Sequence, residues 1–197
     1  MVPAKQEKRL KGIVDSLKKG KVYRASDFSK LSTSPSRDLN LLAKANLITY
    51  LGKGLYLKPR KLGKLDIPPR TEDLISVFLK TDKFLIRNLS DFNMLRLGTT
   101  QLFKEVHVYN ERRDGRVRLG NKTYHFKKKK FPSSHYDEYL LVDMLNNLEK
   151  LGVEREEVLH KLKYRWGKNL ELDKKVVHRF AKKYGKYWVK KFFEKME

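Results

Sequence analysis

The stretch "SPSRDLNLLAKANLITYLGKGLYLKP", residues 34–59, decides the fold of the first third of the chain. Its opening pair, Ser34-Pro35, favours a helix start because proline suits the first helical position. Leu39 and Leu42 recur at helical spacing and predict one buried stripe. Two short β-prone runs then meet at a Gly-Lys-Gly triplet, which predicts a hairpin over residues 47–58.

The residues before this stretch predict two more helices. Residues 4–19 carry an apolar stripe at i, i+3, i+4 and i+7, made of Leu10, Ile13, Val14 and Leu17. Ser26 is a candidate cap for a short second helix that buries Phe28 and Leu31. Three helices followed by a two-stranded hairpin is the order of a winged helix-turn-helix domain.

In that arrangement the third helix enters the major groove of DNA and the hairpin lies along the backbone beside it. The exposed face of the third helix would present Ser36, Arg37, Asn40 and Lys44. The hairpin tip and its exit would place Lys53, Lys58, Arg60 and Lys61 against phosphates. The alternative is that these residues are ordinary solvated charges on a surface helix and hairpin.

The rest of the chain predicts two further regions and an α+β fold. Prolines and glycine in residues 59–70 mark a boundary, so the predicted domains are 1–62, 63–131 and 132–197. The middle domain is expected to hold a helix from Thr71 and a small antiparallel sheet, with a short helix capped by Ser90. Its strand-like runs are 84–86, 106–109, 116–119 and 122–126. The region after Pro132 is expected to be wholly helical.

Composition restricts the partners. The 197 residues carry a formal net charge of +23, which indicates a polyanionic partner, most often nucleic acid. The hydrophobic fraction of 40% is enough to build buried cores. The absence of cysteine suits a reducing cytoplasm. No apolar run approaches the roughly 20 residues of a membrane span, so no membrane partner is expected.

Catalysis and metal binding find little support in the sequence. His107 and His125 lie in alternating strand patterns, but a metal site would need Glu105 or Asp114 as a third ligand. A nuclease would need clustered carboxylates on a strand with a lysine, whereas Glu111 and Asp114 are expected in a turn beside arginines. No glycine-rich phosphate loop or serine elbow appears. We therefore expect no enzyme activity, no metal and no cofactor.

Three segments together carry a resemblance to a known family. They are the hairpin ending Gly54-Leu55-Tyr56-Leu57-Lys58-Pro59, the mid-chain "LSDFNMLRLGTTQLFKEVHVYNE" and the later "RVRLGNKTYHFKKKK". Over roughly residues 5–130 the chain resembles the AbiEi-type antitoxins of bacterial type IV toxin–antitoxin systems, which have an N-terminal winged helix. The helical tail matches only in being helical.

The resemblance implies a transcriptional autorepressor that binds an operator inverted repeat. It also implies that the protein opposes a cognate nucleotidyltransferase toxin without forming a stable complex with it. Two copies must lie on an inverted repeat, and a homodimer could form only on DNA. The alternative from another class is an RNA-binding or ribosome-associated factor that uses the basic tail, whose aromatic residues could stack on bases.

Overall fold

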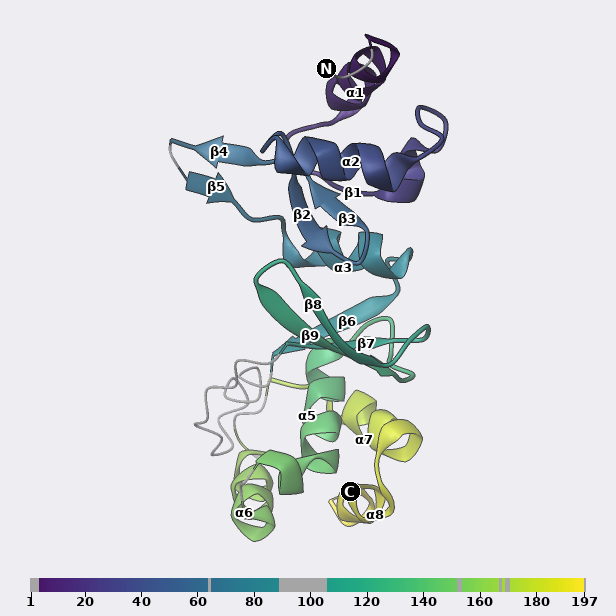
Figure 1. Cartoon of the computed structure of the whole chain (residues 1–197). Helices are drawn as coiled ribbons and strands as arrows, with labels where there is room; N and C mark the ends of the chain where they lie inside the picture. Colours follow the sequence, from purple (N-terminus) through teal and green to yellow (C-terminus); the bar gives the residue numbers. More distant parts are fainter. Residues whose placement is uncertain are drawn as a thin grey trace. The chain divides into compact units, whose positions relative to one another are not determined.

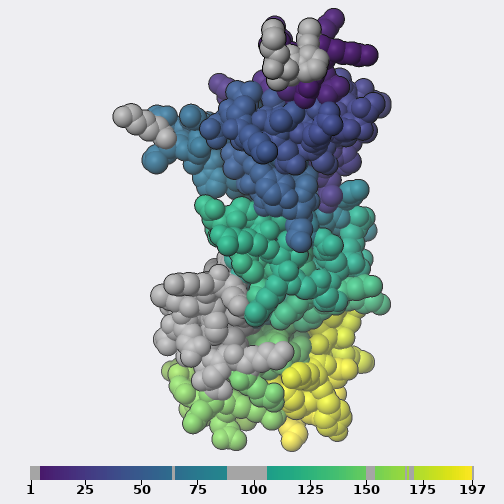
Figure 2. Space-filling view, in the orientation of Figure 1, coloured from purple at the N-terminus to yellow at the C-terminus, as the bar shows by residue number. Residues whose placement is uncertain are grey.

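The computed structural model (Figures 1 and 2) describes residues 4–63, 65–88, 106–151, 154–166, 168 and 171–196. It has mixed α and β structure with antiparallel sheets, as the sequence predicts. The chain divides into two compact units. The N-terminal unit comprises Met1–Phe84 and Asp114–Phe126, and the C-terminal unit comprises Leu85–Arg113 and Lys127–Glu197. This division differs from the three consecutive segments expected from the prolines.

The N-terminal unit contains the predicted first and third helices and the predicted hairpin, together with a strand, Val22–Arg24, that the sequence did not predict. Helix α1 (Ala4–Ser16) is followed by strand β1 (Val22–Arg24), the 3₁₀ turn η1 (Ala25–Phe28) and helix α2 (Pro35–Lys44). Strands β2 (Thr49–Gly52) and β3 (Leu55–Leu57) form the hairpin, and β1 completes a sheet of order β1-β3-β2. The buried core of this part consists of Ile13, Phe28, Leu39, Leu42, Ile48 and Tyr56.

Local details differ from the sequence predictions at the second helix. It is only one 3₁₀ turn, and Ser26 lies inside the turn instead of capping it. Arg24 is the capping residue, and its backbone N–H donates to the Asp27 carboxylate at 2.8 Å. Leu31, which was expected to be buried, is 47% exposed. Helix α1 ends at Ser16, earlier than the predicted residue 19.

The segment between the β2–β3 hairpin and the next helix was expected to be a domain boundary, but it contains two paired strands. Strands β4 (Arg60–Leu62) and β5 (Leu65–Ile67) pair as a second antiparallel hairpin. Helix α3 (Thr71–Leu79) then packs within the N-terminal unit, since the Arg24 guanidinium donates to the carbonyls of Val77, at 2.7 Å, and Phe78. The segment 63–84 therefore belongs with the N-terminal elements and not with a separate middle domain.

The four strand-like runs of the middle region are all strands. They are β6 (Phe84–Asn88), β7 (Val106–Asn110), β8 (Gly115–Leu119) and β9 (Lys122–Lys128), in a sheet of order β6-β7-β9-β8. Strands β8 and β9 turn at Gly120, whose φ of +58° favours glycine. The predicted helix cap Ser90 and most of the mid-chain segment of the family resemblance lie outside the described residues.

The C-terminal unit is helical after Pro132, as predicted. It contains α5 (Tyr136–Asn146), the 3₁₀ turn η2 (Leu148–Leu151), α6 (Arg155–Trp166), α7 (Lys174–Tyr184) and α8 (Tyr187–Glu194). Asp173 is the N-cap of α7. Its carboxylate accepts hydrogen bonds from the backbone N–H groups of Lys175 and Val176 at 2.9 and 3.2 Å. The aromatic and aliphatic stripes of the tail form one core, which includes Tyr139, Trp166, Phe180 and Phe193.

A buried polar cluster anchors α5 in this unit. The Asp143 carboxylate, which is fully buried, accepts from Arg87, from the Tyr109 hydroxyl at 2.7 Å and from Lys129 at 2.5 Å. Arg87 is only 3% exposed, so Asp143 compensates its charge out of contact with water, while the partly exposed Lys129 adds a second cation to the cluster. Burial, with Asp143 close by, raises the pKa of Tyr109 well above its usual value and keeps the phenol protonated. Across the described residues, no helix is long and apolar enough for a membrane crossing.

Candidate nucleic-acid interface

The outer face of α2 is the best candidate surface. Leu39 and Leu42 point into the core, with 0% and 3% of their surface exposed. The opposite face exposes all four predicted helix residues, which are Ser36, Arg37, Asn40 and Lys44. Proline at the first helical position starts the helix immediately before this face begins. The 3.6-residue period thus separates one buried stripe from one polar stripe.

A shallow hollow lies on this face. Its volume is about 640 Å³, and it is lined by Arg37, Asn40, Leu41, Ala43, Lys44 and Tyr50. Leu41 is 37% exposed and Tyr50, from β2, is 52% exposed. The surface therefore combines two cations and an amide with two exposed apolar side chains. Tyr50 was not among the candidate residues predicted from the sequence. It lies in the predicted hairpin that follows the third helix, and this position could have indicated it.

Asn40 is held in position from the hairpin. The Tyr56 hydroxyl donates to Asn40 Oδ1 at 2.9 Å. Tyr56 is 3% exposed, and its ring packs against Tyr50 with 5.2 Å between ring centroids. This is the only side-chain hydrogen bond of Asn40 among the described residues, so its amide hydrogens and a second Oδ1 lone pair remain for a ligand.

The buried side of α2 is fixed by one carboxylate. Asp38 is fully buried, and Arg9 of α1 binds it through two bonds, Nε to Oδ2 at 2.6 Å and Nη2 to Oδ1 at 3.0 Å. The Ser32 hydroxyl donates to the same carboxylate at 2.6 Å. Burial acts to raise the pKa of Asp38, but the hydrogen bonds from Arg9 and Ser32 outweigh it and hold the pKa below its usual value. The first turn of α2 is thereby locked to α1.

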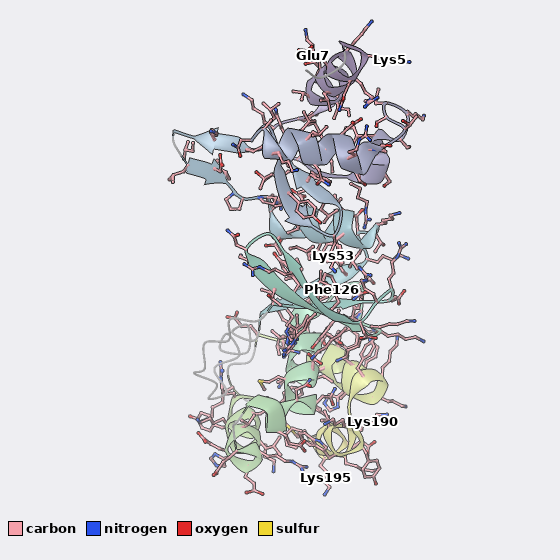
Figure 3. The ribbon with its side chains drawn as sticks, viewed as in Figure 1. Lys5, Glu7, Lys53, Phe126, Lys190 and Lys195 are labelled. Atoms are coloured by element: carbon pink, nitrogen blue, oxygen red, sulfur yellow. The ribbon has the colours of Figure 1, made fainter. Side chains whose placement is uncertain are left out.

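The hairpin cations are not all on this face. Lys53 is exposed at the β2–β3 turn, where its φ is +52°. Figure 3 shows Lys53 at the end of the hairpin that lies away from α2. That end approaches the β8–β9 turn, because the Gly120 N–H donates to the Leu51 carbonyl at 2.7 Å. Lys53, which was expected to meet phosphates beside the third helix, therefore does not lie on the face formed by α2.

Lys58 has a local partner. Its ammonium group donates to the Leu47 carbonyl at 3.2 Å, just beyond the C-terminal end of α2. The bond ties the exit of β3 to the chain that leaves the helix. Lys58 is only partly exposed, so its charge strengthens the positive potential near α2 while the side chain has a structural contact.

Arg60 and Lys61 lie on the second hairpin, in a segment that was expected to be the exit of the first hairpin and a domain boundary. Both are exposed on β4. Arg60 sits near Gly20 at the base of this hairpin, where a Cβ on the glycine would lie 3.7 Å from Arg60 Cβ. A sequence signal that could have found this hairpin is Gly63 between two short runs that each contain a leucine.

The histidines do not assemble a metal site in the described part of the chain. No three histidine, aspartate or glutamate side chains there are grouped to hold a metal ion. His125 Nδ1 accepts a hydrogen bond from Arg116 Nε at 3.4 Å, so this ring nitrogen faces a cationic side chain and not another metal ligand. Glu105, one of the two ligands considered from the sequence, lies outside the described residues.

Two comparisons with known proteins found no relative of the chain. No protein-family model matches it, and no curated protein matches it.

Proposed function

We propose that the chain is a DNA-binding transcriptional regulator that reads the major groove with α2. The observation that carries the proposal is the outer face of α2, where Arg37, Asn40 and Lys44 surround exposed apolar side chains on a helix fixed from behind. The order of α1, β1, η1, α2 and the β2–β3 hairpin supports a winged helix-turn-helix reading. A recognition helix needs an exposed polar face and a rigid attachment, and α2 has both.

The side chains on this face match the hydrogen-bonding pattern of base edges. An arginine donates two bonds to guanine O6 and N7, and an asparagine exchanges two bonds with adenine N6 and N7. Arg37 and Asn40 are three residues apart, so they lie on adjacent turns of the exposed face. The Tyr56 hydroxyl fixes the orientation of the Asn40 amide before DNA arrives. Leu41 and Tyr50 supply apolar contacts suited to a thymine methyl group.

Sequence-independent affinity would come from the surrounding cations. Lys44 stands at the C-terminal end of α2, and Arg60 and Lys61 extend from the second hairpin. Each phosphate neutralised by such a side chain releases counterions, so the observed binding constant falls with salt at a slope of about −0.9 per contact. The net charge of +23 makes this term large.

The finer proposal is an autorepressor that serves as the antitoxin of a type IV toxin–antitoxin system, and it rests on the resemblance. The protein would bind an inverted repeat upstream of its own gene and oppose a nucleotidyltransferase toxin without a stable complex. Co-expression tests it. Growth arrest by the adjacent gene product should be relieved by this chain, while the two proteins should separate in size-exclusion chromatography.

The DNA proposal is tested by footprinting on the upstream region and by titration at several salt concentrations. Arg37→Ala and Asn40→Ala should each cost about 1–3 kcal/mol on the cognate site and much less on random duplex. Arg70→Ala is the matched control, since Arg70 is exposed at the start of α3 and does not lie on the α2 face. Equal losses in all three variants, or no protected site, would contradict major-groove reading by α2.

One observation favours the RNA-binding alternative. The exposed side of α7 carries five cations and no acidic residue: Lys174, Lys175, Arg179, Lys182 and Lys183. Like charges four residues apart destabilise a helix unless a polyanion neutralises them. Competition separates the two readings. Tighter binding to structured RNA than to any duplex DNA, lost on changing Arg179 and Lys183 to alanine, would support the alternative.

A further inference from the structure

The second hairpin, β4–β5, is an arm in which two exposed leucines flank the turn, and we call this leucine pair the tip. We call residues Arg60–Ile67 the arm. Leu62 pairs directly with Leu65 across the two strands, and the two side chains are 71% and 73% exposed. Arg60 pairs with Ile67, so Arg60 lies on the same face as the two leucines. Figures 1 and 2 show the arm projecting beyond the C-terminal end of α2.

An arm of this kind has few interactions of its own to stabilise it in water. An isolated two-stranded hairpin is marginally stable, and here each strand has three residues. Two leucines paired side by side at its tip expose apolar surface instead of covering it. The leucine pair is therefore available to a ligand.

The size of the tip argues against a protein as that ligand. Specific protein interfaces bury about 1,200–2,000 Å² in total, far more than two leucine side chains supply. A nucleic acid suits the tip better, since small apolar wedges enter the minor groove between base steps while adjacent cations bind phosphates. Arg60 lies at the base of the arm on the leucine face, and Lys61 lies beside it on the opposite face.

The path of the chain connects the arm to the proposed recognition helix. Lys58, two residues before β4, is bonded to the Leu47 carbonyl just after α2. The base of the arm rests near Gly20. The arm therefore starts beside the C-terminal end of α2 and leads away from it. The groove next to a major groove in duplex DNA is a minor groove, so an arm that extends past the end of α2 is suited to reach it.

We propose that the arm is a minor-groove element whose Leu62 and Leu65 wedge between base pairs next to the site read by α2. This inference rests on the proposed DNA-binding function and adds a second groove to it. It also assigns the arm cations distinct roles. Lys61 contacts a phosphate without sequence preference, whereas the leucine pair unstacks bases.

The test uses the full chain and its footprinted duplex, with 2-aminopurine placed at successive positions flanking the α2 site. The wild-type protein should raise 2-aminopurine fluorescence at one flanking step, because unstacking relieves quenching. The double variant Leu62→Ala/Leu65→Ala should abolish this rise and weaken binding about tenfold. The variant Lys61→Ala should keep the rise and lower the salt slope by about one. The minor-groove ligand distamycin should compete with the wild type and not with the double variant.

Leu31→Ala is the matched control, because Leu31 is also an exposed leucine of the N-terminal unit but lies before α2. It should retain the fluorescence rise and the affinity. If no duplex binds, the proposed function fails. If the duplex binds but the double variant keeps both the rise and the affinity, the arm inference fails while the function stands. If the double variant instead lowers the sedimentation coefficient and leaves DNA binding unchanged, the tip is a protein interface and the inference is overturned.

Discussion

Replacing the Asp38 carboxylate by an amide tests how α2 is held. Asp38→Asn keeps the size of the side chain but removes the charge that binds Arg9 by two bonds and accepts from Ser32. Breaking a buried ion pair by changing one partner costs about 3–5 kcal/mol. The Arg9 side chain is 27% exposed and keeps part of its hydration, so the lower end, about 3 kcal/mol, is expected.

Hydrogen exchange measures this loss where it occurs. In the intact chain, amides in peptides that cover α1 and α2 should exchange about a hundredfold faster in Asp38→Asn, since each 1.4 kcal/mol is a factor of ten. Asp15→Asn is the control, because Asp15 is an exposed carboxylate on α1 with no part in the pair. Unchanged exchange in α2, or an equal change in both variants, would refute the role given to Asp38.

The same carboxylate predicts a pH dependence with a definite sign. The folded pKa of Asp38 lies below its unfolded value of about 3.9, so the unfolded state binds more protons in the window between them. The stabilisation is fully present above about pH 5 and is lost as pH falls through the folded pKa. Urea unfolding from pH 7 to pH 2.5 should show the wild type and Asp38→Asn converging at the acid end. A gap that stays constant would contradict the argument.

Three further substitutions probe other parts of the structure. Tyr56→Phe should cost about 1 kcal/mol in urea unfolding and weaken cognate DNA binding a few-fold, because Asn40 loses its fixed orientation; equal weakening on random duplex would contradict this. Asn110→Ala should cost about 2–3 kcal/mol, because the Asn110 side chain bonds five backbone groups in and beside the turn after β7. A surface-like loss below about 0.5 kcal/mol would refute this role. Asp143→Asn should cost about 3–5 kcal/mol, because it leaves the buried Arg87 charge uncompensated. The chain's two tryptophans, Trp166 and Trp188, report unfolding of this unit by fluorescence. An unchanged unfolding transition would contradict the role given to Asp143.

Local elements could be predicted because their signals are local. The 3.6-residue period marks which face of α2 is buried, and glycine between β-prone runs marks the β2–β3 and β8–β9 turns. The shortest elements of the fold were harder to predict from the sequence. Strand β1 has three residues, and η1 is a single turn, so neither is long enough to show a period.

Some features of the candidate site could likewise be predicted from the sequence, and others could not. The helix period predicts that Arg37, Asn40 and Lys44 share an exposed face, and they do. No period reveals that Lys53 lies at the end of the hairpin away from α2, since the orientation of the turn depends on its contact with Gly120, far along the chain. The Arg9–Asp38 pair likewise joins residues 29 positions apart.

The sequence by itself determined the net positive charge, the β2–β3 hairpin with the helix before it, and the polar face of α2, because composition, turn residues and periodicity do not depend on distant contacts. Only the tertiary structure decided which of the cations lie together, that residues 60–67 form an arm with two exposed leucines, and that residues 114–126 join the N-terminal unit. Those features depend on which buried faces meet, and segments distant in sequence make that choice through packing and long-range hydrogen bonds.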